Sequence, residues 1–172
     1  AITGLDLSNK KLDGIAFINS QLISVNFTNA SLKNAVFDTN SSTSGATFAS
    51  TNLEQATLSG GISTTTFSNA RLYATTISGV LTDTTIIYSK VDALNASTAT
   101  MTRLRAYNNY YDKTYPPTLP QYWGNVGGTF LGPSVNLAGI TPSMDTSSYG
   151  IKYLTNINLT GADLHGSTSV SY

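Results

Sequence analysis

The sequence has no cysteine among its 172 residues. This absence excludes disulfide bridges, thiolate nucleophiles and metal sites with Cys ligands, but it leaves the cellular compartment open. A continuous apolar run of about 18 residues, the length that a transmembrane helix needs, is also absent. The first residues, AITGLDLSNK, contain neither the basic segment nor the apolar segment of a signal peptide. We therefore predict no membrane span and no thiol chemistry.

The sequence also has little charge, and that charge is balanced. Lys and Arg together number nine, as do Asp and Glu, and only 10% of the residues are charged. Without an excess of either sign there is no broad field to attract nucleic acid, so we expect no nucleic-acid partner. Ser, Thr, Asn and Gly take surface positions that Lys and Glu usually occupy in cytosolic proteins. This composition favours an extracytoplasmic, secreted or virion-surface location over the cytoplasm.

Residues suited to catalysis or metal binding are few and scattered. His165 is the only histidine, and we expect it to be a solvated surface residue, although Asp163 would share its face in an extended segment. The acidic residues occur singly, so neither converging metal ligands nor paired catalytic carboxylates are evident. The glycines of 59–61 and 124–128 lack the Lys and the strand-to-helix context of a phosphate loop. We predict no enzyme, no catalytic residue, no metal site and no cofactor.

What the sequence does contain is a regular spacing of large apolar residues. From Leu7 to Phe37 one occurs at every fifth position, and the residue two places earlier is often small or apolar. Helices and strands have periods of about 3.6 and 2, so neither accounts for this spacing. Fixed self-similarity indicates a repeat architecture. If four units make a turn of about 20 residues, turns stacked at the strand spacing of about 4.8 Å give a square-sectioned β-solenoid.

The period continues beyond Phe37 with a few changes of step. One extra residue enters in DTNSSTSG, and four-residue steps shorten the segments 58–67 and 77–86. The apolar side chains become smaller towards Met101, and the repeat returns near the C-terminus in SVNLAG and YLTNINLTGADLHG. The main positions of the predicted core ladder are Leu7, Leu12, Phe17, Leu22, Phe27, Leu32, Phe37, Phe48, Leu53, Leu58, Phe67, Leu72, Ile77, Leu159 and Leu164.

Units such as VNFTN, TNLEQ, VNLAG, INLTG and ADLHG resemble the A(D/N)LxX consensus of the pentapeptide-repeat family. The resemblance covers residues 5 to about 101, 135–139 and 152–166. It implies an all-β fold, a right-handed quadrilateral β-helix in which the central Leu or Phe and the small residue two places before it both point inward. An Asn or Asp before a central residue, such as Asn26 or Asn52, suits a turn because its side chain can bind a nearby backbone amide.

Positions one full turn apart should stack on one face of such a coil. The alternation of Phe and Leu then places aromatic columns on two opposite faces and aliphatic columns on the other two. An uncovered end would expose unpaired strands, so homo-oligomerisation through the solenoid ends, or flanking domains, would cover it. The predicted stacked pairs are Phe17 with Phe37, Leu12 with Leu32 and Leu7 with Phe27.

Residues 102–134 differ in composition from the rest of the chain. They hold seven aromatic residues, and all five prolines lie between Pro116 and Pro142. Proline cannot donate a ladder hydrogen bond, so we expect a single domain, 1–172, whose β-helix stops or is bypassed at an insertion or capping segment of about 102–134. This segment covers the solenoid, forms a recognition surface, or does both. The candidate partner-binding residues are Tyr107, Tyr110, Tyr111, Tyr115, Tyr122 and Trp123.

The resulting hypothesis is a non-enzymatic structural or binding module, a rigid β-solenoid that presents its aromatic segment to a protein or glycan partner. One alternative is a polysaccharide-acting β-helix hydrolase. Another is an ice-binding surface, although Thr28, Thr47, Thr57, Thr66 and Thr76 do not repeat cleanly at the length of one turn. Some members of the family that the chain resembles inhibit topoisomerases as DNA mimics. We do not expect that function here, because it depends on a strongly acidic surface and a dimer.

Overall fold

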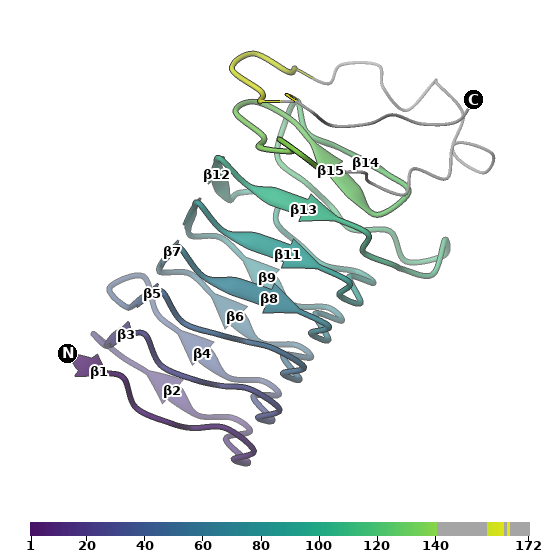
Figure 1. Cartoon of the computed structure of the whole chain (residues 1–172). Helices are drawn as coiled ribbons and strands as arrows, with labels where there is room; N and C mark the ends of the chain where they lie inside the picture. The colour runs from purple at the N-terminus through teal and green to yellow at the C-terminus, as the bar shows by residue number, and fades with distance from the viewer. Residues whose placement is uncertain (141–157, 164, 166–172) are drawn as a thin grey trace.

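The computed structural model describes residues 1–140, 158–163 and 165. These residues contain no helix, and they form short strands and isolated β-bridges joined by tight corners. Successive coils of the chain lie on top of one another along one axis, beginning at the N-terminus (Figure 1). The fold is therefore all-β, a β-solenoid of about five turns, as the five-residue period predicts.

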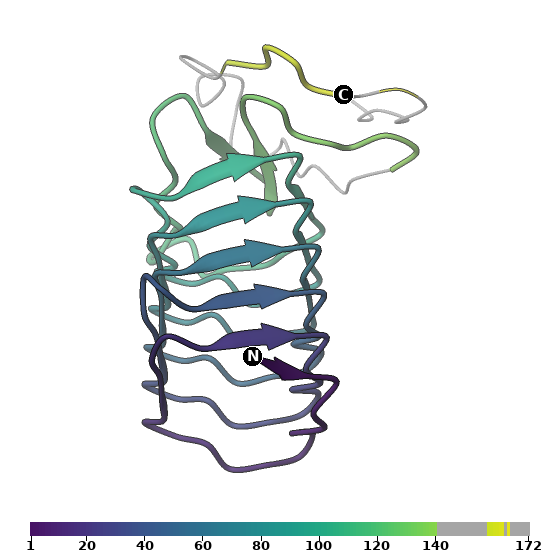
Figure 2. The same cartoon turned by 90° about the vertical axis from the view of Figure 1, so that its left-hand side faces the viewer.

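We number the four faces of the solenoid in the order in which the chain visits them, and the coils by their strand on the first face. The first face is a six-stranded parallel sheet (Figure 2). Its strands, in spatial order, are β1 (Ile2–Thr3), β3 (Gln21–Ile23), β5 (Ser42–Ser44), β7 (Gly61–Ser63), β10 (Val80–Thr82) and β12 (Thr100–Thr102).

The other three faces are narrower parallel ladders. Isolated bridges on the second face lead into the strands β8 (Thr66–Ser68), β11 (Thr85–Ile87) and β13 (Arg105–Tyr107). The third face consists of isolated bridges that join Lys11, Ser31, Asn52, Arg71, Lys90 and Tyr110 in turn. The fourth face contains β2 (Ala16–Phe17), β4 (Val36–Phe37), β6 (Thr57–Leu58) and β9 (Thr76–Ile77).

The interior is filled by the predicted aromatic columns. Phe27, Phe48 and Phe67 stack on the second face, with neighbouring ring centroids 4.8 Å apart. Phe17 stacks on Phe37 on the fourth face at 4.7 Å, and Phe37 meets the rings of the opposite column edge-on at 6.1 and 6.2 Å. The pairs Asp6–Asn26 and Lys11–Ser31 place Leu7 against Phe27 and Leu12 against Leu32. All three predicted stacked pairs are therefore confirmed.

The predicted changes of step are also confirmed. The extra residue after Phe37 makes one coil longer, so that Leu22 pairs with Thr43. A shorter coil lies further along the axis, where Ile62 pairs with Leu81. The ladder of the first face therefore stays in register although its coils differ in length.

The four-residue steps fall at two corners, at Gly60 and Gly79. A Cβ on Gly60 would lie 1.9 Å from the Ser41 carbonyl oxygen, and one on Gly79 would lie 1.8 Å from the Gly60 carbonyl oxygen. Any side chain at either corner would therefore collide with the backbone of the preceding coil.

Polar side chains support the coil in two ways. The Asn side chain before a central residue accepts a hydrogen bond from the amide two residues ahead, at 3.0 Å from Asn26 Oδ1 to Thr28 N and at 3.1 Å from Asn52 Oδ1 to Glu54 N. These are the predicted turns. In several coils a buried Thr replaces the small inward residue and donates to a carbonyl of the preceding coil, as Thr51 does to Phe27 at 2.7 Å.

The solenoid continues past residue 102, which corrects the predicted boundary of the inserted segment. β13 pairs with β11 in register, Tyr110 pairs with Lys90, and Thr118 pairs with Asn95. The inward residues of this sixth coil, Leu104 and Ala106, are fully buried. The first two prolines, Pro116 and Pro117, fall in a widened corner between Tyr111 and Thr118, so they interrupt no ladder hydrogen bond.

An antiparallel hairpin follows the sixth coil. It consists of β14 (Gly124–Val126) and β15 (Thr129–Leu131), and Phe130 enters the main core with no exposed surface. Gly128 of its turn accepts hydrogen bonds from the backbone and the side chain of Asn109, both at 3.2 Å. The hairpin therefore covers the interior where the regular coils end (Figure 1). A second apolar cluster beyond it contains Val126, Leu131, Val135, Leu137 and Ile140.

The C-terminal repeats are described only in part. Asn136 forms a parallel bridge with Asp163, and the Leu137 amide donates to the Asp163 carbonyl at 2.8 Å. Leu159 was predicted to be a core residue, but its side chain is 43% exposed, because the described residues place no further coil over it. Leu164 lies outside the described residues.

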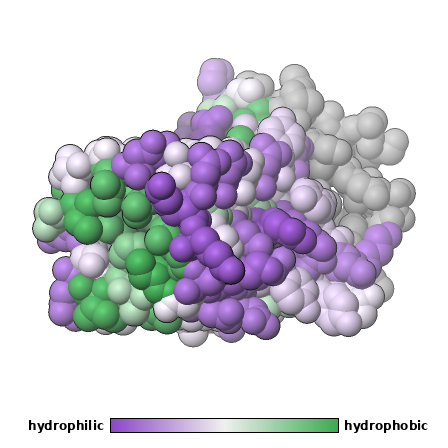
Figure 3. All heavy atoms as spheres, turned by 90° about the horizontal axis from the view of Figure 1, so that it is seen from below, coloured by the Kyte–Doolittle hydropathy of each residue, from purple (hydrophilic) through white to green (hydrophobic). Residues whose placement is uncertain are grey.

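Apolar surface gathers at the N-terminal coils. Leu7 and Leu12 of the predicted ladder are only partly buried, because the first coil has no neighbour on one side. Seen from below, apolar residues gather at the N-terminal end of the solenoid, among polar ones (Figure 3). Exposed apolar residues of these coils are Ile2, Leu5, Ile18, Ile23 and Val36. None of the described residues belongs to a helix that is long and apolar enough to cross a membrane.

Candidate functional site

Three of the six aromatic residues predicted to contact a partner are more than half exposed. Tyr110 ends the bridge ladder of the third face, where it pairs with Lys90. Tyr115 lies within the widened corner, and its carbonyl accepts a hydrogen bond from the Ala93 amide at 2.7 Å. Tyr122 lies beyond the sixth coil. Two of the three exposed rings therefore belong to the third face.

The other three predicted residues, Tyr107, Tyr111 and Trp123, are half-buried. Tyr111 packs against the main core, Tyr107 packs against the second apolar cluster, and Trp123 packs against both. A Cβ on Gly132 would lie 2.0 Å from the Trp123 ring, so the indole lies directly over that glycine. These side chains contribute to packing at the C-terminal end of the solenoid, and little of each ring remains for a partner.

Two exposed tyrosines were not among the predicted binding residues. Tyr73 follows the buried Leu72 on the third face, and 39% of its surface is exposed. Tyr88 stands at the corner between the second and third faces, is 49% exposed, and its hydroxyl oxygen lies 3.5 Å from Asn108 Nδ2. The five-residue period marks both positions as outward. Tyr73 and Tyr88 lie near Tyr110 only because of the number of residues in the coils between them. The aromatic content of residues 102–134 does not indicate that number.

One column of the third face aligns Tyr73 with Tyr115. The carbonyls of this column accept hydrogen bonds of 2.7–2.9 Å from the corner amides of the preceding coil. Asp112, Lys113 and Thr114 are an insertion ahead of Tyr115, and this insertion brings the tyrosine into register. Tyr73 and Tyr115 are therefore two coils apart, about 10 Å along the axis. The accepting residues, in order, are Lys33, Glu54, Tyr73, Asp92 and Tyr115.

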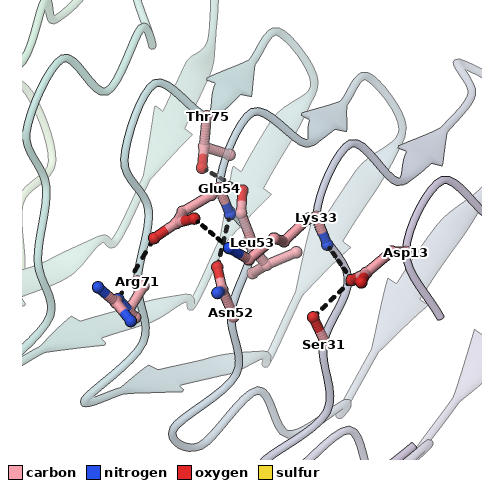
Figure 4. A network of polar contacts seen from close by, with 8 residues as sticks. All are labelled: Asp13, Ser31, Lys33, Asn52, Leu53, Glu54, Arg71 and Thr75. Carbon is pink, nitrogen blue, oxygen red and sulfur yellow. Dashed lines mark hydrogen bonds and ion pairs between the residues drawn. The ribbon is translucent and has the colours of Figure 1, made fainter. Parts of the chain in front are cut away.

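The third face also carries most of the charge on the regular coils, arranged as compensating pairs. Glu54 bridges two cations, with its carboxylate oxygens 2.8 Å from Lys33 Nζ and 3.4 Å from Arg71 Nε (Figure 4). Asp13, one coil before Lys33, accepts hydrogen bonds from the Ser31 hydroxyl and the Lys33 backbone amide (Figure 4). Because cations and carboxylates alternate, the face presents polar groups without a net field of one sign.

The hydrogen bonds of this network keep its carboxylates ionised. The side-chain hydrogen bond from Lys33 lowers the pKa of Glu54 from its ordinary value. The hydrogen bond from the Ser31 hydroxyl lowers the pKa of Asp13, with a further contribution from the Lys33 amide. Both groups are therefore charged at neutral pH.

Asp92, between Tyr73 and Tyr115 in the column, is a buried carboxylate. Its Oδ1 accepts a hydrogen bond from the Asp112 amide at 3.0 Å and lies 3.9 Å from Lys90 Nζ. Its Oδ2 is buried without a hydrogen-bond partner. A buried polar atom without a partner costs about 1–3 kcal/mol, so the rest of the coil must hold this side chain in place.

The carboxylates of the third face are poorly suited to acid catalysis. Asp92 and Asp112 do lie on successive coils, a proximity that the sequence did not indicate. A glycosidase needs one carboxylic acid with a raised pKa, whereas the backbone N–H of Thr114 lowers the pKa of Asp112. His165 is exposed, as expected, and its backbone amide, at 3.1 Å, donates to Asp163 Oδ1. Among the described residues, no three potential ligands from His, Asp and Glu come together as a metal site.

Four of the five threonines considered for ice binding, all except Thr28, align with another threonine in space despite their irregular spacing in sequence. Thr47, Thr66 and Thr85 pair in turn on the second face, and Thr57 pairs with Thr76 on the fourth. The shorter coils bring them into register. The column on the second face is bounded by Asn26 and Arg105, so its Thr run is three coils long.

The comparisons with known proteins agree with the repeat geometry. The family model for pentapeptide repeats matches residues 3–38, in eight copies. No curated protein matches the sequence.

Solved structures that are similar include three proteins. A pentapeptide repeat protein from the Arabidopsis thaliana thylakoid lumen has 20% identity and a TM-score of 0.39, over 61% of this chain and 70% of that one. QnrB1, a plasmid-mediated fluoroquinolone resistance protein, has 11% identity and a TM-score of 0.44, over 92% and 88%. HetL from Nostoc sp. strain PCC 7120 has 15% identity and a TM-score of 0.38, over 96% and 75%. The matched segment, the five-residue period and the four-faced coil coincide, so the predicted resemblance of this chain to the pentapeptide-repeat family is confirmed.

Proposed function

We propose that this protein is a non-enzymatic binding module, a rigid solenoid that presents the exposed tyrosines of its C-terminal coils to a protein or glycan partner. The observation that carries the proposal is the exposure of Tyr110 and Tyr115, at 55% and 51%, on the face that also carries the charged side chains. Tyrosine offers a large flat contact area with a polar tip, and it loses little conformational entropy on binding.

The scaffold supports such a role. Each coil is hydrogen-bonded to its neighbours on all four faces, so the outward side chains stand on a backbone that is already ordered. A preorganised surface has little ordering to lose when a partner binds. The lowered pKa of Asp112 argues against the alternative of a polysaccharide hydrolase, because this carboxyl is ionised at neutral pH and cannot serve as a proton donor.

The test is a double variant, Tyr110→Ser with Tyr115→Ser, compared with the unmodified chain on a glycan array and a protein microarray. The matched control is Ile18→Ser with Val80→Ser, which removes exposed apolar side chains, 55% and 50% exposed, from the fourth and first faces. We expect the tyrosine variant to lose at least tenfold in binding while the control keeps it, with similar melting temperatures. Unchanged binding by the tyrosine variant would contradict the proposal.

The Thr column of the second face favours ice binding as a second candidate function. Thr47, Thr66 and Thr85 present hydroxyl and methyl groups at the coil spacing of about 4.8 Å. Thermal hysteresis of the unmodified chain, compared with Thr66→Lys, tests this function. A freezing point equal to the melting point in the unmodified chain would exclude it.

A further inference from the structure

We infer that the third face between the fourth and sixth coils binds a neutral, extended polysaccharide along the solenoid axis, with Tyr73 and Tyr115 as its two stacking platforms. This inference rests on the proposed binding function and names the ligand and its direction. Tyr73 belongs to the site although it lies outside the aromatic segment.

The spacing of the two platforms is the first argument. Their carbonyls occupy the same ladder position two coils apart, with Asp92 between them. Two coils span about 10 Å, roughly the length of two pyranose rings in an extended chain. A chain of at least three rings that lies parallel to the axis could therefore contact both tyrosines with alternate sugars. Stacking of this kind uses the flat apolar face of a pyranose ring.

The polar groups around the platforms are the second argument. Arg71, 58% exposed, and Lys90, 39% exposed, stand in the neighbouring column and offer N–H donors, and Tyr110 ends that column. The exposed Asp112 carboxylate offers acceptor oxygens. Sugar hydroxyls both donate and accept hydrogen bonds, so a ligand seated between the tyrosines would find partners on both sides.

The balance of charge indicates a neutral sugar. Arg71 and Lys90 each face a carboxylate, Glu54 at 3.4 Å and Asp92 at 3.9 Å. Their charges are compensated within the protein, so a polyanionic glycan would gain little by displacing those partners. The weak field of the face favours a ligand that binds by stacking and hydrogen bonds.

The distribution of exposed aliphatic residues argues for a glycan rather than a protein partner. Exposed aliphatic residues such as Ile18, Ile23 and Val80 lie on the first and fourth faces. The buried centre of a protein interface is usually apolar, whereas a sugar site combines aromatic rings with polar groups. The outward side chains of the third face in these coils, none of them aliphatic, are Arg71, Tyr73, Lys90, Tyr110 and Tyr115, whereas Asp92 is buried.

The test uses the complete chain and neutral β-linked gluco- and manno-oligosaccharides of two to six rings, titrated by calorimetry. We expect affinity to rise at least tenfold between two and four rings. Tyr73→Ala and Tyr115→Ala should each lose at least tenfold for the longer ligands and leave the weak disaccharide affinity within about threefold, because the remaining platform still stacks one ring. Tyr73→Phe should retain binding. Val80→Ala, which removes an exposed side chain from the first face of the fifth coil, is the control and should leave the affinity unchanged.

The outcomes separate this inference from the proposed function. Binding to a protein on the microarray without affinity for any neutral oligosaccharide would overturn the inference and leave the binding module intact. Tighter, salt-sensitive binding of sulfated or uronic-acid chains would also overturn it. Oligosaccharide binding that is unaffected by Tyr73→Ala would contradict the proposal that two tyrosine platforms form the site. New reducing ends released from the oligosaccharides would overturn the non-enzymatic function itself.

Discussion

The rings of Phe27 and Phe48 lie 4.8 Å apart and only 11° from parallel, one coil above the other. Each is fully buried, and the ring of Phe37 meets both edge-on from the opposite face. The core of this part of the solenoid is therefore a continuous set of aromatic contacts in which every ring from Phe17 to Phe67 touches at least one ring of an adjacent coil.

Replacement of Phe48 by Ala should lower the free energy of unfolding by about 3–5 kcal/mol, because it removes a buried ring between Phe27 and Phe67 and leaves a cavity. Urea denaturation followed by circular dichroism measures this change. Phe48→Leu keeps much of the volume and should cost clearly less. An Ala variant as stable as the Leu variant would show that the ring contacts do not hold the coils together.

Gly60→Ala should destabilise the protein far more than Gly61→Ala. A Cβ at Gly60 would lie 1.9 Å from the Ser41 carbonyl oxygen, whereas a Cβ at the adjacent Gly61 would lie 3.9 Å from the Ser42 Cβ, an ordinary contact. The two melting temperatures give a direct comparison. Equal melting temperatures would mean that the four-residue corner relaxes without cost.

Acidification should destabilise the fold through the carboxylates of the third face. The pKa values of Asp13 and Glu54 are lowered in the folded state by the hydrogen bonds from Ser31 and Lys33. A carboxyl with a lowered folded pKa contributes stability above its unfolded pKa, and this contribution is lost as the pH falls through the folded pKa. The melting temperature should therefore be nearly constant near neutrality and fall below about pH 4.

Asp13→Asn is the variant that checks the origin of this pH dependence. The Asn side chain cannot ionise, so the variant should melt at a lower temperature than the unmodified chain at pH 7. Its melting temperature should also fall less on acidification. A melting temperature that rises below about pH 4 in the unmodified chain would contradict the assigned direction of the pKa shifts.

The buried Thr75 hydroxyl donates to the Leu53 carbonyl of the preceding coil at 2.7 Å. Thr75→Val keeps the shape and removes this hydrogen bond, and since the Ala56 amide still donates to the same carbonyl, the cost should be only about 0.5–1.5 kcal/mol. Thr75→Ala should cost more because it also leaves a cavity. Chemical denaturation of the two variants measures the difference, and equal costs would assign the whole effect to the hydroxyl.

The sequence predicted the first four coils well because large apolar residues occupy every central position but one, where Thr43 replaces them. It misplaced the end of the ladder because the two inward positions exchange sizes in the later coils. Leu94 fills the small position before Ala96, and Leu104 fills it before Ala106, and all four are buried. The interior is filled as long as the two inward side chains of a repeat have the right combined volume. A pattern that looks only for a large central residue therefore ends the core ladder too early.

The candidate site was harder to predict than the core. Tyr110 and Tyr115 could be found from the aromatic content of their segment, but that content could not separate them from the half-buried Tyr111 and Trp123. The alignment of Tyr73 with Tyr115 depends on a three-residue insertion at the sixth coil. Side-chain exposure in that region follows from how the hairpin covers the solenoid end, which is a tertiary effect.

Coils with different numbers of residues rise by the same distance along the solenoid axis. The long coil that pairs Leu22 with Thr43 and the short one that pairs Ile62 with Leu81 both advance the molecule by one strand spacing, because a corner absorbs the extra or missing residue. Two surface side chains can therefore be moved apart only in whole steps, by adding or removing a complete coil between them. A coil grafted between Tyr73 and Tyr115 would therefore increase the distance between the two tyrosines by one strand spacing, about 4.8 Å. A correspondingly longer ligand would then be needed to contact both.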